Sequence, residues 1–455
     1  MSEIEKIIKE ILPKITPTKK DRNTIKKVLD SLLTKITHEL ISMKINPSVE
    51  VVGSIAKDTY LRDSLDIDVF LLFDPKVKRN KIAHTTKTIG KKILSDTEEC
   101  YAEHPYIRGM FRDFKIELVP GYKIQDATEK ISAVDRTPLH TKYIQKHISD
   151  RQKQDIRLFK QFLHGINCYG AEAEIQGFSG YLCEILILYF QNFPKLLKKA
   201  KDWEPPIRLS LHDEPTNAFT DPLIFIDPVD SKRNVASAVS EKTLHRFINA
   251  CNEFLKHPKS TFFFPNPVKP WNLSKIKTRI KKQNNQFVGI IFPKPNLISE
   301  NLIPQIRKTC RVIQKEAERN GFSIHDIDFT IDQSNDLIYI IIQTDQKPLS
   351  KSFTHPGPPV KLINHKNKFI EKWKDHPLIE STPYEKNNRL YVKVKRTHRT
   401  LIPFLMETLQ EYSLGRHIEH AIKNHYLILK DQELVKKELQ GFWTKYFDGL
   451  EPWER

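Results

Sequence analysis

Helix-like and strand-like hydrophobic patterns follow one another in the first third of the chain. Within residues 21–43 the apolar side chains of Val28, Leu32 and Ile36 recur at helical spacing. Residues 66–73 alternate at first and then become continuously apolar, which is typical of a buried central strand. The helices and strands predicted in this way cover residues 3–12, 21–43, 49–52, 66–73, 79–95 and 115–119. Their order predicts an α/β unit over roughly the first 145 residues.

The middle of the chain is mostly helical in pattern. Residues 178–193 are apolar almost all round, which predicts a buried helix, and residues 241–256 form a helix for which Ser240 is the expected N-cap. Between these helices, residues 213–234 are rich in Pro and Asp and predict loops and turns with one short apolar run.

The last part of the chain begins with a proline-punctuated stretch, residues 261–272, which is the predicted linker. Beyond it, a strand, a helix and two more strands predict a small α+β body with an RRM-like topology. These elements cover residues 287–292, 299–319, 322–332 and 336–345. A further helical pattern begins at Thr400.

Composition narrows the classes of function. A net charge of +18 and a pI near 9.4 indicate either a protein that binds a polyanion, most commonly nucleic acid, or a solvated basic surface. Only 14 Gly and no GxGxxG motif argue against a glycine-rich dinucleotide site. Five scattered Cys without a CxxC motif favour reduced thiols in the cytoplasm over disulfides or structural zinc. We expect no membrane span and no signal peptide, because no apolar run is long enough.

Two carboxylates begin the predicted central strand. Asp66 and Asp68 are two residues apart, so on a strand they lie on the same face. Neighbouring carboxylates repel each other unless a cation lies between them, and hard oxygen ligands of this kind suit Mg²⁺. Asp-x-Asp alone would ordinarily be a surface turn. Its position inside an apolar strand favours a metal site for phosphoryl transfer.

The residues just before this strand are suited to phosphate. Gly53 and Ser54 lie where a strand is expected to turn into a short helix, and Gly allows the backbone to approach a ligand closely. The Ser hydroxyl can hold phosphate oxygens, and Lys57 follows one turn later. A third carboxylate is expected from a neighbouring strand, where Glu117 lies between apolar residues. The alternative for Glu117 is a salt bridge to a helix lysine.

These residues together resemble the polymerase-β-type nucleotidyltransferase superfamily. Three further stretches resemble the archaeal, class I CCA-adding tRNA nucleotidyltransferases in particular. They are AVDRTPLHTKYI at 133–144, LFKQFLHGINCYGAE with GFSGYLCE at 158–184, and DPVDSKRNVASAVS at 227–240. The match covers residues 35–260, and beyond 260 it depends on domain order and charge.

The resemblance implies an α+β multidomain enzyme that adds CCA to the 3′ end of tRNA from CTP and ATP, using Mg²⁺ and no template. It implies a nucleotidyltransferase head at 1–146, a helical neck at 147–260, a body at 261–346 completed by 401–455, and a basic tail at 347–400. The implied catalytic and metal-binding residues, for two ions, are Asp66, Asp68 and Glu117. The implied nucleotide-binding residues are Gly53, Ser54, Lys57, Arg136, Thr137, His140, Lys160, Tyr169 and Arg233.

The sequence departs from the family pattern at two of these positions. Lys57 stands where the family commonly has Arg, and Glu117 stands where it usually has Asp. Three further residues could instead have purely structural roles. His140 could cap a helix, Tyr169 could be a packed core aromatic, and Lys160 could belong to a solvated helix face.

The tail is the most basic block of the chain. Residues 347–400 hold 13 Lys or Arg against four acidic residues, with Trp373, Tyr384 and Tyr391 among them. Such a segment suits RNA that is bound by shape, and the resemblance implies contact with the acceptor stem and T arm of tRNA. Residues 275–282 form a second basic patch or a solvated helix face. The sequence leaves the oligomeric state open, including a homodimer. The rival functions are an ATP-specific poly(A) polymerase or oligoadenylate synthetase, and a non-catalytic RNA-binding protein.

Overall fold

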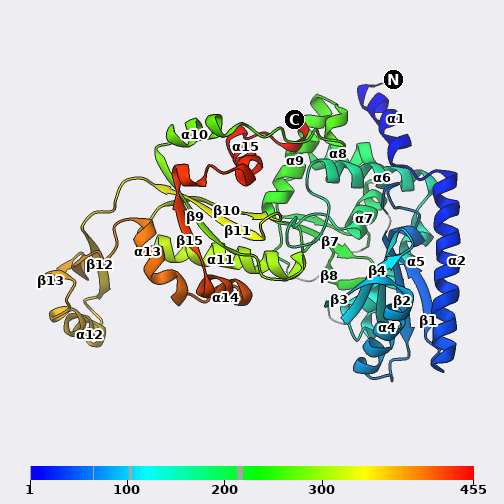
Figure 1. Ribbon diagram of the computed structural model, residues 1–455, viewed down its shortest axis with the longest axis horizontal. Helices are drawn as coiled ribbons and strands as arrows, with labels where there is room; N and C mark the ends of the chain where they lie inside the picture. The colour runs from blue at the N-terminus through cyan, green and yellow to red at the C-terminus, as the bar shows by residue number, and fades with distance from the viewer. Residues whose placement is uncertain (1, 65, 102–104, 213–218) are drawn as a thin grey trace. The chain divides into compact units, whose positions relative to one another are not determined.

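The computed structural model describes residues 2–64, 66–101, 105–212 and 219–455, which divide into two compact units (Figure 1). Unit 1 comprises Met1–Pro267 and Leu450–Arg455, and unit 2 comprises Val268–Gly449. Among the described residues, no helix combines the length and the apolar character needed to cross a membrane. The α+β multidomain prediction is confirmed.

Unit 1 contains a five-stranded sheet with the order β1-β2-β5-β4-β3. The pair β2–β5 is parallel and the other pairs are antiparallel. These strands are β1 (Ser48–Val52), β2 (Asp66–Phe73), β3 (Ser95–Tyr101), β4 (Pro105–Phe111) and β5 (Phe114–Tyr122). The sequence had predicted β1, β2 and β5 but neither β3 nor β4.

Alternate side chains of β2 point to opposite faces of the sheet. Ile67, Val69 and Leu71 pack against α2 (Lys19–Ser42) and α4 (Arg79–Ile93), which cover one side of the sheet. Phe70 and Leu72 belong to a smaller cluster that includes Val52 and Val119. Because side chains alternate along a strand, Asp66 and Asp68 lie on this second side, as the spacing predicted. The short helix α3 (Gly53–Ala56) connects β1 to this edge.

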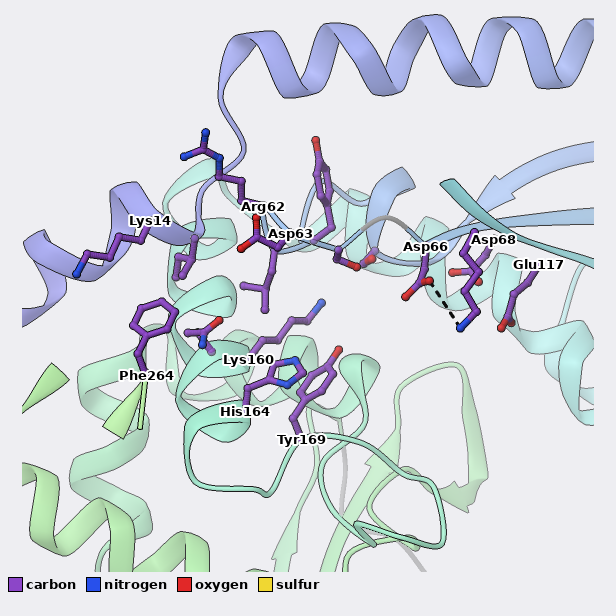
Figure 2. A pocket seen from close by; sticks show the side chains of 17 residues that line it. Lys14, Arg62, Asp63, Asp66, Asp68, Glu117, Lys160, His164, Tyr169 and Phe264 are labelled. Atoms are coloured by element: carbon purple, nitrogen blue, oxygen red, sulfur yellow. Dashed lines mark ion pairs between the residues drawn. The ribbon is translucent and has the colours of Figure 1, made fainter. Parts of the chain in front are cut away.

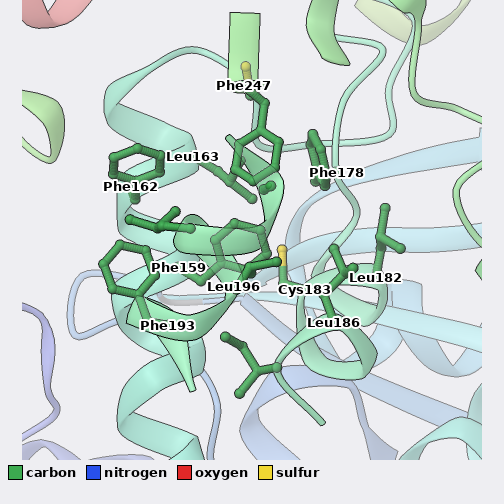
Figure 3. Packing of buried hydrophobic residues seen from close by; sticks show 14 of the residues in the cluster. Phe159, Phe162, Leu163, Phe178, Leu182, Cys183, Leu186, Phe193, Leu196 and Phe247 are labelled. Atoms are coloured by element: carbon green, nitrogen blue, oxygen red, sulfur yellow. The ribbon is translucent and has the colours of Figure 1, made fainter. Parts of the chain in front are cut away.

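A helical region completes unit 1. Its core is built from aromatic side chains such as Phe159, Phe162, Phe178, Phe193 and Phe247, all fully buried (Figure 3). The helices are α1 (Glu3–Ile15), α5 (Thr137–His147), α6 (Asp150–Gly165), α7 (Gly180–Phe190), α8 (Phe193–Ala200) and α9 (Glu241–Lys256).

Two predictions for this region have clear outcomes. Ser240 caps α9 by accepting a hydrogen bond from the backbone N–H of Thr243, as predicted. The stretch 213–234 was predicted as loops and turns with one short apolar run, and that run is strand β7 of a three-stranded sheet of order β6-β7-β8. Strand β8 was not predicted, and residues 213–218 lie outside the described residues. The strands of this sheet are β6 (Ile207–Leu209), β7 (Leu223–Asp227) and β8 (Asp230–Asn234). Strands this short carry too little pattern to be recognised from sequence.

Unit 2 contains a four-stranded antiparallel sheet of order β10-β11-β9-β15. Its elements follow the order strand, helix, strand, strand, helix, strand, which is the order of a split βαβ fold. Side chains of α10 and α15, such as Ile276 and Trp443, cover one face, and α11 packs along β10. The elements are α10 (Leu273–Lys281), β9 (Asn285–Pro293), α11 (Ser299–Arg319), β10 (Ile324–Asp332), β11 (Leu337–Asp345), α13 (Leu401–Thr408), α14 (Arg416–Asn424), β15 (Leu427–Lys430) and α15 (Gln440–Asp448).

The basic segment inserted between β11 and α13 folds into a small sheet with one helix. Its order is β12-β14-β13, and the strands are β12 (Ser352–Pro359), β13 (Ile379–Lys386) and β14 (Arg389–Lys395). The helix α12 (Ile363–Lys374) packs on this sheet through Trp373 and Phe369.

Candidate active site

A cavity of about 630 Å³ in unit 1 gathers six of the residues predicted as site residues. They are Ser54, Asp66, Asp68, Glu117, Lys160 and Tyr169. In Figure 2 the three carboxylates lie at one end of the cavity and Lys14 and Phe264 at the other, with Lys160 and Tyr169 between them. The cavity therefore joins an acidic end on the sheet to a basic and aromatic wall in the helical region.

Gly53 makes room for the central carboxylate. Its φ of 72° lies in the left-handed region, and a Cβ at this position would be 2.0 Å from the Oδ2 atom of Asp68. Only a residue without a side chain fits between the start of α3 and β2 in this arrangement. The neighbouring Ser54 then lines the cavity beside Asp68.

The carboxylates are brought together by strand register. Asp68 on β2 pairs with Glu117 on β5, and Asp66 pairs with Lys115. Burial raises the pKa of Asp68 to about 7, and the negative charges of Glu117 and Asp66 add to the shift. Asp66 is mostly exposed, and its carboxylate lies 4.0 Å from the Lys115 ammonium. The protein thus leaves Asp68 beside like charges.

Glu117 has a cationic partner of its own. The Nε atom of Arg108 donates to its Oε1 atom at 2.9 Å, and Nη2 lies 2.8 Å from the same oxygen in an ion pair. Arg108 lies directly opposite Glu117 on β4, so the pair is also set by register. The ion-pair alternative predicted for Glu117 is therefore present, although the partner lies on a strand and not on a helix.

The donor chemistry of this edge fits a divalent metal. Three carboxylates supply hard oxygen ligands, and a cation would relieve the repulsion and burial that raise the pKa of Asp68. Within the described part of the chain, no three His, Cys, Asp or Glu side chains are grouped as a ready metal site. The ion pair with Arg108 fixes the orientation of the Glu117 carboxylate at this edge.

Lys57 and Lys160 meet at a buried carboxylate on α7. Lys57 Nζ lies 2.5 Å from Glu184 Oε2, and Lys160 Nζ lies 3.4 Å from Glu184 Oε1. Thr59 donates to the same carboxylate at 2.6 Å. Burial alone would raise the pKa of Glu184, but the two lysines hold it below its usual range. Lys160 is thus buried and not on a solvated face, and Lys57 points at Glu184.

A second buried carboxylate, Asp227 at the end of β7, collects two other predicted residues. His140 Nε2 lies 2.8 Å from its Oδ2 atom, and Arg233 Nη1 lies 2.9 Å from the same oxygen. Tyr181 donates to Oδ1 at 3.1 Å and stacks on His140 with ring centroids 3.9 Å apart. Burial would raise the pKa of Asp227, but the hydrogen bond and charge of His140 and the contact with Arg233 lower it to about 2.

The remaining predicted residues lie close to these groups in the fold. Arg136 pairs with Asp230 at 2.9 Å, and Thr137 begins α5. Tyr169 stands against His164 with ring centroids 4.1 Å apart, and burial raises the pKa of its hydroxyl. His140 lies inside α5 and is buried, so it is not a helix cap.

Comparison with known proteins decides the family. Models of a nucleotidyltransferase domain, the second domain of tRNA nucleotidyltransferase and the C-terminal domain of CCA-adding enzyme match residues 32–140, 154–264 and 283–431. The CCA-adding enzyme of Haloarcula marismortui is 31% identical over 464 residues, which cover 98% of this chain and 99% of the relative. This chain belongs to the CCA-adding enzyme family.

Other members of the CCA-adding enzyme family are similarly close. That of Methanothermobacter thermautotrophicus is 31% identical over 98% of both chains, and that of Thermoplasma acidophilum is 34% identical over 91% of this chain and 93% of its own. A solved structure of the Cid1 poly(U) polymerase with Mg 3′-dATP aligns with 57% of this chain and 96% of its own, at 17% identity and a TM-score of 0.44.

Three acids that hold predicted nucleotide-binding side chains in place were not predicted from the sequence. Glu184, Asp227 and Asp230 each pair with at least one predicted nucleotide-binding residue. A signal for Glu184 was available, because an acid in a nearly all-apolar helix needs a cationic partner. Lys14, His164 and Phe264, which also line the cavity, had no comparable signal.

Proposed function

We propose that this protein adds CCA to the 3′ end of tRNA, using CTP and ATP and no nucleic-acid template. The observation that carries the proposal is the match to CCA-adding enzymes over 98% of the chain, with 99% of the Haloarcula relative covered. It extends to the C-terminal family model at residues 283–431, a part of the chain outside the nucleotidyltransferase domain.

The proposed reaction is a nucleotidyl transfer at the carboxylate edge. The 3′ hydroxyl of the tRNA loses its proton near Asp68 and Glu117, and its oxygen bonds to the α-phosphorus of the nucleotide. The bond from that phosphorus to the pyrophosphate leaving group breaks. Asp66, Asp68 and Glu117 would hold the metal, since they line the same cavity. Nucleotidyltransferases of this kind generally use a divalent metal, and we propose two Mg²⁺ ions, which supply positive charge to the reacting phosphate.

The wall of the cavity supplies the nucleotide site in this proposal. Ser54, Lys160 and Tyr169 border the cavity beside the carboxylates and are suited to the triphosphate and sugar. Lys57 reaches a phosphate only by sharing its ammonium with Glu184. The full proposed nucleotide-binding set is Gly53, Ser54, Lys57, Arg136, Thr137, His140, Lys160, Tyr169 and Arg233.

We also propose how the rest of the chain serves tRNA. The head at 1–146 and the neck at 147–260 carry out the reaction, and the tail at 347–400 holds the acceptor stem and T arm. The body at 261–346 with 401–455 supports the tail, and a homodimer remains a proposal. The five buried free cysteines suit the reducing conditions of the cytoplasm.

The test is incorporation of labelled CTP and then ATP into tRNA that lacks its 3′ CCA. We expect two cytidines followed by one adenosine, with release of pyrophosphate. Incorporation of ATP alone would contradict the proposal and favour a poly(A) polymerase. The Asp68→Ala variant is the matched control, because contaminating transferases would still act in its preparation.

A further inference from the structure

Asp227 is a single buried carboxylate that holds side chains from three other elements. Its side chain is fully buried, and its Oδ2 atom contacts His140 of α5 at 2.8 Å and Arg233 of β8 at 2.9 Å. Its Oδ1 atom accepts from the hydroxyl of Tyr181 on α7 and from the backbone N–H of Val229, both at 3.1 Å. Both oxygens are therefore occupied, and neither His140 nor Arg233 can turn without breaking a bond to Asp227.

The carboxylate also determines which nitrogen of His140 carries a hydrogen. The pKa of Asp227 is lowered to about 2, so the carboxylate is ionised near pH 7 and only accepts hydrogen bonds. Burial lowers the pKa of His140, so its ring is neutral at that pH. The Nε2 atom is then the donor to Asp227, which leaves the lone pair of Nδ1 as an acceptor.

Arg233 supplies the opposite chemistry beside this acceptor. Its guanidinium has N–H donors and no acceptor, and its Nη1 atom is taken by Asp227. The side chain of Arg233 is 31% exposed, so part of it is open to a ligand. Because Arg233 and His140 bond to the same oxygen, a fixed donor and a fixed acceptor lie beside each other.

The matching pattern of one donor next to one acceptor occurs on two of the four bases. Cytosine and adenine each carry an exocyclic amino group, which donates, next to a ring nitrogen that accepts. Uracil and guanine carry a carbonyl oxygen next to a ring N–H, which reverses both roles. A site whose polar groups would be left unpaired by the wrong ligand rejects that ligand strongly. The pair of Arg233 and His140 therefore complements cytosine and adenine and opposes uracil and guanine.

We propose that Asp227 is a positioning residue for base selection, because it holds Arg233 and His140 as one donor–acceptor pair for the base of the incoming nucleotide. The arginine donates to the ring nitrogen, and Nδ1 of His140 accepts from the amino group. Tyr181 keeps the pair in place, since its ring stacks on His140 with centroids 3.9 Å apart and its hydroxyl bonds to Asp227. The inference rests on the proposed function for the identity of the nucleotides.

The experiment measures kcat/KM of the full-length protein for CTP, ATP, UTP and GTP on tRNA lacking CCA. In Asp227→Asn the amide can donate to Nε2 of His140, which moves the ring hydrogen to Nδ1 and suits the carbonyl of uracil. We expect the preference for CTP over UTP to fall roughly 10- to 100-fold, the range for loss of a charge-assisted hydrogen bond. Tyr181→Phe keeps the ring but loses the hydroxyl, and the preference should fall roughly 2- to 10-fold.

A matched variant separates base selection from a general effect on the fold. Asp155→Asn changes another buried acid of the helical region, which accepts a hydrogen bond from the backbone N–H of Phe193 at 3.0 Å. Its preference for CTP over UTP should equal that of the wild type, whatever its stability. An equal loss of activity with all four nucleotides in Asp227→Asn would make Asp227 purely structural and overturn the inference. An unchanged preference in Tyr181→Phe would also count against it.

Binding measured without transfer keeps the inference separate from the proposed function. Calorimetric titration of the wild type and of Asp227→Asn with CTP and with UTP should show the same loss of preference. Failure of the wild type to incorporate CTP, with this binding preference intact, would refute the proposed function alone. Equal affinities of the wild type for CTP and UTP would overturn the inference.

Discussion

Acidic side chains in two parts of unit 1 have opposite electrostatic surroundings. At the sheet edge, Asp68 stands beside Glu117 and Asp66, and its pKa rises to about 7. In the helical region, Asp227 contacts His140 and Arg233, and its pKa falls to about 2. The helical region thus balances its buried acids with its own cations, whereas the sheet edge leaves a negative surplus that an external cation can neutralise.

Acids whose charge is balanced by the protein form structural ion pairs, whereas an acid left beside other acids is suited to bind an external cation. Glu184 is fully buried and satisfied by Lys57, Lys160 and Thr59, so it connects the loop after α3 to helices α6 and α7. Removing such a carboxylate should affect stability first. Asp68 is buried beside the carboxylates of Glu117 and Asp66, which outweigh the opposing charge of Lys57, so its removal should affect catalysis and spare the fold.

The largest expected effect is that of Asp68→Ala on catalysis. Nucleotide incorporation should fall by at least roughly 1,000-fold, because the central metal-binding carboxylate is lost. The free energy of unfolding should not fall, since a repulsive group is removed. CTP incorporation and urea denaturation of the same preparation check both halves. Substantial activity would refute the metal assignment, and tRNA affinity should survive.

Glu184→Gln tests the helical side of the comparison. It leaves two buried lysines without their counter-charge, and we expect a loss of about 3–5 kcal/mol in the free energy of unfolding. Glu253→Gln on α9 is the control, because its ion pair with Lys256 is exposed and should contribute less than about 1 kcal/mol. Equal, small effects of the two substitutions in urea denaturation would contradict the distinction.

The stability cost of Asp227→Asn should depend on pH, because neighbouring groups stabilise the ionised carboxylate of Asp227. Its folded pKa of about 2 lies below its ordinary value of 3.8, so ionisation stabilises the fold above that value and the benefit is lost as the pH falls through 2. The substitution should cost about 2 kcal/mol at pH 7 and about half as much at pH 3. Urea denaturation at both pH values measures this, and a cost independent of pH would contradict it.

Arg108→Ala should have the smallest effect of these substitutions, and it tests whether Glu117 binds the metal. If Arg108 orients this carboxylate toward a metal, its removal should weaken Mg²⁺ affinity by roughly tenfold. Calorimetric titration of the protein with Mg²⁺ measures the affinity apart from catalysis. Arg112→Ala, a few residues along the same hairpin and exposed, is the control. Unchanged affinity would make Glu117 a purely structural partner of Arg108.

Local patterns were enough to predict several elements and to single out three acids that line the same cavity. The helix predicted at 299–319 is α11 with the same bounds, because apolar periodicity and flanking residues act locally. The spacing of Asp66 and Asp68 was enough to place them on one face of β2. Strands such as β3, with the sequence SDTEECY, carry no such pattern and form only by pairing with β4.

Which charges meet depends on contacts between distant parts of the chain. Lys57 and Glu184 are 127 residues apart, and the sequence around either residue does not identify the other as its partner. Which face of the tail sheet is buried likewise depends on the side on which α12 packs. Local chemistry determines what a side chain can bind, whereas burial and partners across the fold determine whether it is already bound within the protein.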